Sequence, residues 1–278
     1  MEDRVAIIGG GNLGTAIARG LAASGKISAD RITITRRSIH LLDGLKQEGF
    51  NIEPDNLTAV RSARVVLVTV RPRQLDAVLR EIGPALDEDK HILISTVSNA
   101  SVAEIKHQLG KSIPVLRAMP NIAVAVGESM TALCSDESVG LEAKEEARGI
   151  FGTLGQTMFI TEEQMTPATA LCACGVAFFL RAIRAAAQGG VEVGFHAEDA
   201  IRLAAQTARG AATLLLEGDT HPETQIDKVT TPMGVTISGL NEMEHHGFSS
   251  AMIRGIVTSA EKATKLYREK ENKNGEDH

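Results

Sequence analysis

A glycine-rich segment, Gly9-Gly-Gly-Asn-Leu-Gly14, directly follows a short apolar run at residues 5–8. The run consists of β-branched and small apolar residues, which is typical of a strand buried on both faces. Residues 15–24 have the composition of a helix, and Gly25 follows them. A strand, a glycine-rich turn and a helix in this order predict the phosphate-binding corner of a parallel α/β sheet.

The same alternation of strands and helices continues through the first half of the chain. We predict further strands at 31–35, 65–70, 91–95 and 115–119, with helices near 74–80 and 102–109 between them. This order favours a parallel sheet with helices on both faces. After about residue 161 the strand pattern ends, and we predict helices at about 167–188, 197–217, 235–246 and 249–268.

Two domains follow from this pattern. We expect an α/β, doubly wound domain at 1–161 and an all-helical domain at 162–278, with a frayed polar end at 269–278. Residues 168–180 carry no charge, so this helix should be buried on every side. A helical domain of this size cannot easily surround one of its own helices. We therefore expect a second copy to cover it in an intertwined homodimer; burial against the first domain alone is the alternative.

Composition excludes several classes of protein. The chain has 29 Lys and Arg against 35 Asp and Glu, a net charge of −6, and only 3% aromatic residues. It therefore lacks the basic groove and the stacking rings of a nucleic-acid binder. Three cysteines form no disulfide framework, which favours the reducing cytoplasm. The longest apolar run, 171–180, is shorter than the roughly 20 residues that cross a membrane, so we expect a soluble protein.

The glycines of the first turn have distinct expected roles. Gly9 permits the tight turn, Gly11 lets a pyrophosphate approach the backbone, and Gly14 lets helix and strand pack closely. The N–H groups of the turn, including Asn12 and Leu13, would then hold the anion with the helix dipole. A plain strand–helix turn is the alternative, and the strand and helix on either side favour cofactor binding.

The end of the second predicted strand selects the cofactor. An NAD-binding protein usually has Asp or Glu here, which binds the ribose 2′-hydroxyl. This chain has Thr35-Arg36-Arg37-Ser38 instead. Two guanidinium groups and a hydroxyl suit a 2′-phosphate. We therefore predict NADPH as the cofactor, with NADH as the alternative.

Three further segments carry a family resemblance. They are Val70-Arg-Pro72, Arg117-Ala-Met-Pro-Asn121 and Val229-Thr-Thr-Pro-Met-Gly-Val-Thr-Ile237. With the glycine-rich start, the chain up to about residue 268 resembles pyrroline-5-carboxylate reductase, which performs the last step of proline biosynthesis. The resemblance implies a Rossmann-type domain, a helical dimerisation domain and dimers that can form a larger ring. It also implies cofactor contacts at Val70, Arg71, Pro72, Met119 and Asn121.

The resemblance further implies that a loop in the helical half holds the substrate carboxylate. By position, its residues are Thr231, Gly234, Val235 and Thr236, and the Thr236 hydroxyl would act catalytically near the ring nitrogen. Ordinary helix-start capping by Thr231 and Thr236, turn formation by Asn121 and packing by Met119 are the alternatives. The chain departs from the family pattern at Arg71, at Ile122-Ala123, at Cys172-Ala-Cys-Gly-Val176 and at Met233, where the family usually has glycine.

The implied reaction needs few protein groups. A protonated cyclic imine accepts hydride directly at carbon, so orientation of the reactants is the main task of the protein. The sequence accordingly shows no His–Asp pair beside a nucleophile and no set of metal ligands. We predict NADPH-dependent reduction of 1-pyrroline-5-carboxylate to L-proline. The alternatives are a reductase of another cyclic imine or small oxo acid, and a non-catalytic NADP-binding regulator.

Overall fold

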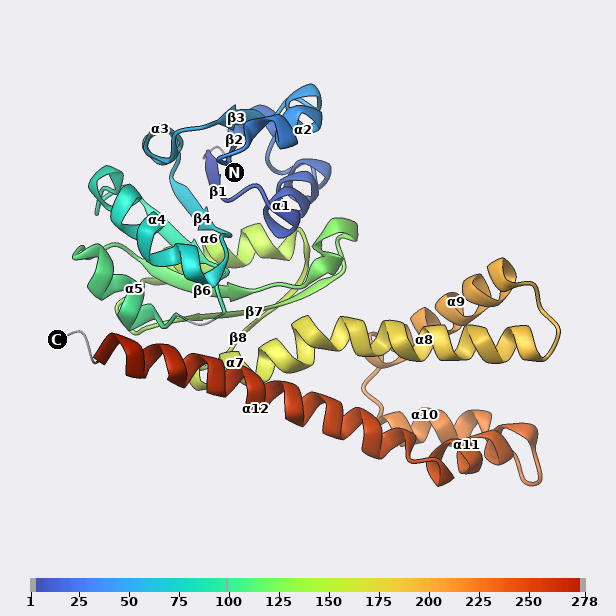
Figure 1. The fold of residues 1–278 in the computed structure, drawn as a ribbon. Coiled ribbons are helices and arrows are strands. Elements are labelled where there is room, and N and C mark those ends of the chain that lie inside the picture. Colours follow the sequence, from blue (N-terminus) through green and yellow to red (C-terminus); the bar gives the residue numbers. More distant parts are fainter. Residues whose placement is uncertain (1–3, 99, 276–278) are drawn as a thin grey trace. The chain divides into compact units, whose positions relative to one another are not determined.

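The computed structural model describes residues 4–98 and 100–275, with side chains as far as residue 265. These residues form two compact units. The first comprises the chain up to Cys174 together with the chain from Ser259 onward, and the second comprises Gly175–Thr258. Figure 1 shows a sheet with helices in the first unit and helices alone in the second.

An eight-stranded sheet forms the centre of the α/β unit, in the order β3-β2-β1-β4-β5-β6-β7-β8. β1 (Val5–Ile8) pairs in parallel with β2 and β4, and all four of its residues are buried. Between β1 and β4 the strand order changes direction, a position at which α/β sheets commonly bind ligands. The other strands are β2 (Ile32–Thr35), β3 (Asn51–Glu53), β4 (Val65–Val68), β5 (Ile92–Ser95), β6 (Val115–Met119), β7 (Ser129–Ser135) and β8 (Gly155–Phe159).

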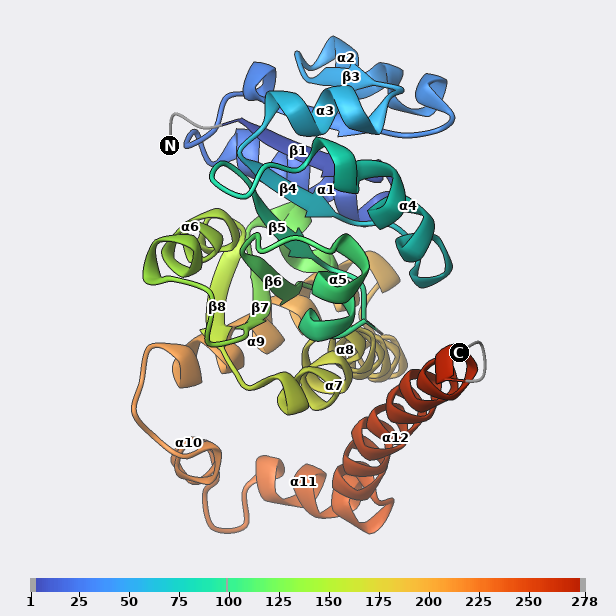
Figure 2. The same cartoon turned by 90° about the vertical axis from the view of Figure 1, so that its left-hand side faces the viewer.

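Helices cover both faces of this sheet because its strands are apolar on both faces. Val5 and Ile7 join one buried cluster, whereas Ala6 and Ile8 join the other, as expected when successive side chains alternate across a strand. The first cluster includes α1 (Asn12–Ala23), α2 (Asp43–Gln47) and α6 (Leu141–Gly152). The second includes α3 (Asn56–Ser62), α4 (Leu75–Ile82) and α5 (Val102–Leu109), which lie together on one side of the sheet in Figure 2.

The predicted fold class, a doubly wound α/β sheet followed by helices, is confirmed, with one difference within the sheet. β7 runs antiparallel to β6, whereas the sequence predicts parallel strands throughout. The sequence analysis also misses β3, β7 and β8. β8 alternates between partly buried and exposed residues at the edge of the sheet, so it lacks the continuous apolar run that marks a central strand.

The second unit consists of helices. They are α8 (Gly175–Glu192), α9 (Ala197–Leu216), α10 (Pro222–Val229), α11 (Val235–His245) and α12 (Phe248–Gly275), the last belonging to this unit as far as Thr258. The chain enters α8 through α7 (Met165–Ala168) and a π-helical turn, Thr169–Cys174. The sequence analysis misses α10, which is short and polar. α12 also continues through residues 269–275, where a frayed end is predicted, because Glu and Lys favour helix; residues 276–278 lie outside the described residues.

Apolar side chains are exposed in the single chain, both in the turn that leads into α8 and in α8 itself. In the charge-free stretch 168–180, Leu171, Phe179 and Leu180 are each more than half exposed. Within the described residues, Glu162–Glu192 is the one helical stretch long and apolar enough to cross a membrane by length and composition, and 17% of its most apolar window is buried. Contiguous exposed apolar side chains of this kind mark interaction surfaces.

Candidate active site

The glycine-rich turn joins β1 to α1 in the geometry that a close ligand requires. Gly9 has a φ of +116°, which side-chain-bearing residues rarely adopt. A β-carbon at Gly14 would lie 2.2 Å from the Gly9 carbonyl oxygen, so only glycine fits there. At Gly11 a β-carbon would meet nothing within 4 Å. The space beside Gly11 is therefore open, and α1 begins there without a side-chain cap.

Thr69, directly after β4, holds this turn in place. Its hydroxyl Oγ1 donates a hydrogen bond of 2.7 Å to the carbonyl oxygen of Gly9. Its backbone N–H donates to the carbonyl of Ile8 at 2.9 Å. The same hydroxyl would lie 2.7 Å from a β-carbon at Gly14. Thr69 thus fixes the turn from the neighbouring strand, a role that sequence analysis did not assign.

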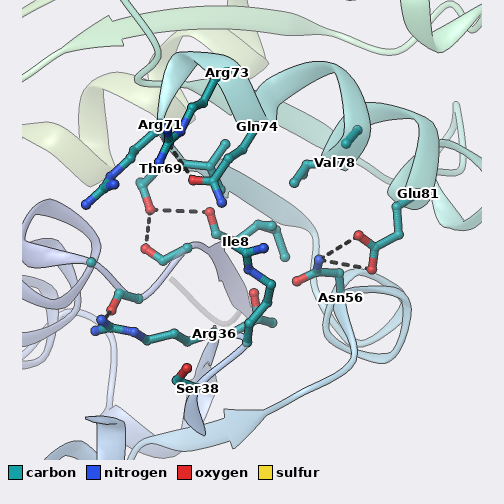
Figure 3. A pocket seen from close by; sticks show the side chains of 17 residues that line it. Ile8, Arg36, Ser38, Asn56, Thr69, Arg71, Arg73, Gln74, Val78 and Glu81 are labelled. Carbon is teal, nitrogen blue, oxygen red and sulfur yellow. Dashed lines mark hydrogen bonds between the residues drawn. The ribbon is translucent and has the colours of Figure 1, made fainter.

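A cavity of about 630 Å³ opens at this corner of the sheet, at the ends of β1, β2 and β4. Figure 3 shows side chains entering it from the segments that follow these three strands. Its lining residues are Ile8, Gly9, Gly10, Gly11, Thr35, Arg36, Arg37, Ser38, Asn56, Thr69, Val70, Arg71, Arg73, Gln74, Ala77, Val78 and Glu81.

Four arginines make one part of this lining cationic. Arg36 and Arg37 follow β2, and Arg71 and Arg73 lie at the short 3₁₀ helix (Pro72–Gln74) after β4. Arg36 donates from Nη1 to the carbonyl oxygen of Gly10 at 2.8 Å, so its guanidinium is held against the glycine turn. A pocket with several guanidinium groups beside a helix N-terminus suits an anionic ligand with more than one phosphate.

The cavity also contains one carboxylate, that of Glu81 on α4. Asn56, the first residue of α3, donates from Nδ2 to both carboxylate oxygens of Glu81 at 3.0 Å. Figure 3 shows this pair lying apart from Arg36 and Arg71. Asn56, Glu81, Arg73 and Gln74 carry no local sequence signal. Packing of α3 and α4 on one face of the sheet brings them to the cavity.

The cavity includes part of the predicted cofactor set. Gly9, Gly11, Arg36, Arg37, Ser38, Val70 and Arg71 line it together. The other predicted cofactor residues, which are Asn12, Leu13, Gly14, Pro72, Met119 and Asn121, are not among the lining residues. Gly14 instead packs α1 against the Gly9 carbonyl, and Met119 is buried in a small cluster with Cys134 and Met165.

Asn121 already has partners within the protein. Its Oδ1 accepts from the N–H of Ala123 at 2.9 Å, and its Nδ2 donates to the carbonyl of Cys172 at 3.2 Å. Only 8% of Asn121 is exposed. The side chain therefore caps the short helix Ile122–Val126 and ties the end of β6 to the π-helical turn.

The predicted carboxylate-binding loop lies in the helical unit, between α10 and α11. The N–H of Gly234 donates to the carbonyl of Thr231 at 2.9 Å, which closes a four-residue turn. A β-carbon at Gly234 would lie 2.4 Å from the Thr231 hydroxyl, so this position requires glycine. Gly234 caps α11 without a side chain, and the first turn of α11, with Val235 and Thr236, contains no acidic residue. This helix start can accept an anion.

Metal-binding side chains and cysteine thiols were two further candidates for catalytic groups. Among residues 4–98 and 100–265, whose side chains the structure describes, no group of three His, Cys, Asp or Glu is positioned to hold a metal. Burial raises the pKa of the Cys134 thiol to about 11, although Arg117 partly opposes this effect. Burial also raises the pKa of Cys172. Both thiols are therefore protonated at neutral pH and are poor nucleophiles.

Comparison with known proteins assigns the chain to a family. Residues 4–99 match the family described as NADP oxidoreductase coenzyme F420-dependent, and residues 162–266 match pyrroline-5-carboxylate reductase dimerisation. Pyrroline-5-carboxylate reductase 2 of Dictyostelium discoideum is 46% identical over 279 residues, which cover 95% of this chain and 93% of that protein. The chain belongs to the pyrroline-5-carboxylate reductase family.

Other members of the pyrroline-5-carboxylate reductase family match over the same length of this chain. Pyrroline-5-carboxylate reductase 1 of Dictyostelium discoideum is 53% identical over 281 residues, covering 97% of this chain. The chain spans about half the length of that relative, 51%. A solved pyrroline-5-carboxylate reductase structure from Coxiella burnetii superposes with a TM-score of 0.87 at 29% identity, covering 96% of this chain and 99% of the other. The resemblance predicted from sequence is confirmed.

Proposed function

We propose that the chain reduces 1-pyrroline-5-carboxylate to L-proline, with NADPH as the hydride donor. The observation that carries this proposal is the open glycine corner beside four arginines, found in a chain of the pyrroline-5-carboxylate reductase family. The corner supports a dinucleotide cofactor, and family membership supports the substrate. NADH is the alternative donor.

The residues around the cavity fit NADPH in two ways. The free space at Gly11 allows a pyrophosphate to approach the uncapped start of α1, including the N–H groups of Asn12 and Leu13. Arg36, Arg37 and Ser38 follow β2 without an acidic residue among them, and this set matches a 2′-phosphate. We propose Arg71 and Arg73 as further phosphate contacts.

The substrate carboxylate would be held by the loop before α11. We propose that the N–H groups of Val235 and Thr236 and the hydroxyls of Thr231 and Thr236 bind it, while Gly234, whose own N–H closes the turn onto the Thr231 carbonyl, lets these groups converge. The uncapped helix start provides these donors together with the positive end of the helix dipole. The Thr236 hydroxyl is the proposed catalytic group, hydrogen-bonded to the ring nitrogen of the substrate.

The proposed reaction depends on the orientation of the imine against the cofactor, and it needs no strong general acid in the protein. A protonated imine has an electrophilic carbon, and NADPH supplies the hydride that adds to it. The carbon–nitrogen double bond becomes a single bond, and the nitrogen keeps its proton as the amine of proline. The protein therefore holds the carboxylate, positions the nitrogen through Thr236 and excludes water.

We further propose a homodimer in the cytoplasm, able to assemble into a larger ring. The dimerisation-family match at residues 162–266 and the exposed apolar side chains of α8 and α9 support the dimer. The Cys134, Cys172 and Cys174 thiols are all free, which suits a reducing compartment.

The test is NADPH oxidation, followed by absorbance, with 1-pyrroline-5-carboxylate as substrate. The six-membered homologue 1-piperideine-6-carboxylate and pyruvate serve as comparison substrates. We expect the highest kcat/KM with 1-pyrroline-5-carboxylate. Turnover with only another substrate would favour the alternative reductase. Binding of NADPH without turnover of any of the three would favour the regulator.

A further inference from the structure

One residue in the cavity at the glycine corner does not match an anionic ligand. Glu81, on α4, is the only acidic residue in the lining of this cavity, and the structure describes every residue of that lining. Four arginines line the same cavity. A carboxylate repels phosphate groups, so it does not add to their binding. Glu81 therefore has another role in this site.

The hydrogen bonds of Glu81 fix the orientation of the Asn56 amide. Asn56 donates from Nδ2 to both carboxylate oxygens of Glu81 at 3.0 Å. A carboxylate only accepts hydrogen bonds, and the nitrogen is the donor of an asparagine side chain. The nitrogen must therefore face Glu81, and the Oδ1 oxygen turns away from it, as Figure 3 shows. Where Asn56 and Glu81 line the cavity, they thus present hydrogen-bond acceptors to a ligand.

An apolar strip on α4 leads to this pair of acceptors. Ala77 and Val78 line the cavity and precede Glu81 by one helical turn, so the three residues share a face of α4. Figure 3 shows Val78 and Glu81 following each other along that helix. Ala77 and Val78 offer an apolar surface, and Asn56 and Glu81 offer polar atoms beyond it. A flat heterocycle with a hydrogen-bond donor at its edge fits this arrangement.

The proposed cofactor carries such a heterocycle at this end. Arg36 and Ser38, the proposed partners of the 2′-phosphate, follow β2, and α3 follows β3, the parallel neighbour of β2. The 2′-phosphate of NADPH is attached to the adenosine ribose, so the base on that ribose lies in the same part of the cavity. Adenine carries an exocyclic amino group, which donates, whereas guanine and hypoxanthine carry a carbonyl oxygen in its place, which accepts. Only the amino group complements an acceptor.

We propose that Glu81 makes the cavity specific for adenine by holding the Asn56 amide with its oxygen toward the base. The Asn56 oxygen then accepts a hydrogen bond from the exocyclic amino group. A base with a carbonyl at that position places two acceptors against each other. Glu81 is a positioning residue, because it acts through Asn56. This inference rests on the proposed function, since it assumes that NADPH is the cofactor.

The experiment compares the full chain with its Glu81→Gln and Arg80→Gln variants. Calorimetry measures the Kd for NADPH and for its analogue in which hypoxanthine replaces adenine. In wild type we expect the analogue to bind at least about fivefold more weakly, because it loses a hydrogen bond and leaves an acceptor unmatched. Glutamine at 81 can donate to the Asn56 oxygen, so the amide can turn and present its nitrogen to the hypoxanthine carbonyl. Glu81→Gln should therefore reduce the preference for adenine to less than about twofold.

The ratio of the two Kd values separates base recognition from other effects of the substitution. Both cofactors carry the same phosphates, so the loss of a negative charge at Glu81 cancels in the ratio. Arg80 is exposed and does not line the cavity, so Arg80→Gln is the matched control on α4 and should keep the wild-type ratio. If Glu81 only joined α3 to α4, its substitution would lower the Tm or weaken both cofactors equally and leave the ratio unchanged.

Three results would overturn the inference. The first is a wild-type preference for adenine below fivefold, and the second is a ratio that Glu81→Gln changes no more than Arg80→Gln does. In both cases NADPH still binds, so the proposed function stands and only the role of Glu81 fails. The third is a wild-type chain that binds neither cofactor, which removes the proposed function as well.

Discussion

Replacing Gly11 by Ala separates the stability of the glycine-rich turn from its proposed binding role. Gly11 has a φ of −86° and a ψ of −170°, which alanine adopts without strain. A methyl group there would contact no atom within 4 Å. Alanine lowers the entropy of the unfolded chain, which stabilises by about 0.4–1 kcal/mol, but it is a poorer helix cap than glycine. These effects oppose each other, so the free energy of unfolding should change by less than about 1 kcal/mol.

The same methyl group should block the cofactor. It would occupy the free space through which a pyrophosphate reaches the backbone N–H groups at the start of α1. Losing one hydrogen bond to a charged group costs about 1.5–3 kcal/mol, which corresponds to a roughly 10–150-fold weaker Kd for NADPH. Isothermal titration calorimetry measures that Kd, and thermal denaturation measures the stability of the same sample.

Gly14→Ala is the matched control. Its β-carbon would lie 2.2 Å from the Gly9 carbonyl oxygen and 2.7 Å from Thr69 Oγ1, so α1 must move away from β1. Overpacking of this kind costs about 1–3 kcal/mol, and we expect a lower Tm. A Gly11→Ala variant that binds NADPH within twofold of wild type would refute the account of this corner.

Three further substitutions test other parts of the site. Arg36→Asp should lower the ratio of kcat/KM with NADPH to kcat/KM with NADH at least about tenfold. The substitution removes the proposed partner of the 2′-phosphate and adds a carboxylate that suits a ribose hydroxyl. An unchanged ratio would exclude Arg36 from cofactor selection. Thr69→Val should weaken NADPH binding about 2–10-fold in calorimetry, because it removes the 2.7 Å hydrogen bond to the Gly9 carbonyl. Thr69→Ser keeps the hydroxyl and should bind NADPH like wild type. Equal Kd values in the two variants would contradict the role of Thr69 in holding the turn. Thr236→Val should lower kcat/KM for the imine about 10–1,000-fold with little change in the Kd for NADPH; wild-type kinetics would remove Thr236 from the mechanism.

The sequence predicts the first strand, the glycine turn and the first helix well because their signals are local. The burial of β1 and the positive φ of Gly9 both follow from residues within a few positions of each other. β7 shows the opposite case, because its place in the sheet comes from antiparallel pairing with β6. No local pattern in residues 129–135 indicates that partner.

The residues of the candidate site also fall into those that local sequence predicts and those that only packing brings together. Arg36, Arg37 and Ser38 are predictable because a cofactor-binding position is expected at a known distance beyond the glycine turn. Thr69 and the Asn56–Glu81 pair reach the cavity only through packing around β4, so their roles require the fold. The family resemblance implies that Met233 stands where a glycine is usual. Only the backbone shows that Met233, and not Gly234, takes the positive φ.

The central claim is that this chain transfers hydride from NADPH to 1-pyrroline-5-carboxylate. The most direct measurement is the amount of L-proline formed per NADPH oxidised when the purified full chain reacts with that imine. We predict one L-proline for each NADPH consumed. NADPH oxidation without L-proline, or bound NADPH that is never oxidised in the presence of the imine, would contradict the claim.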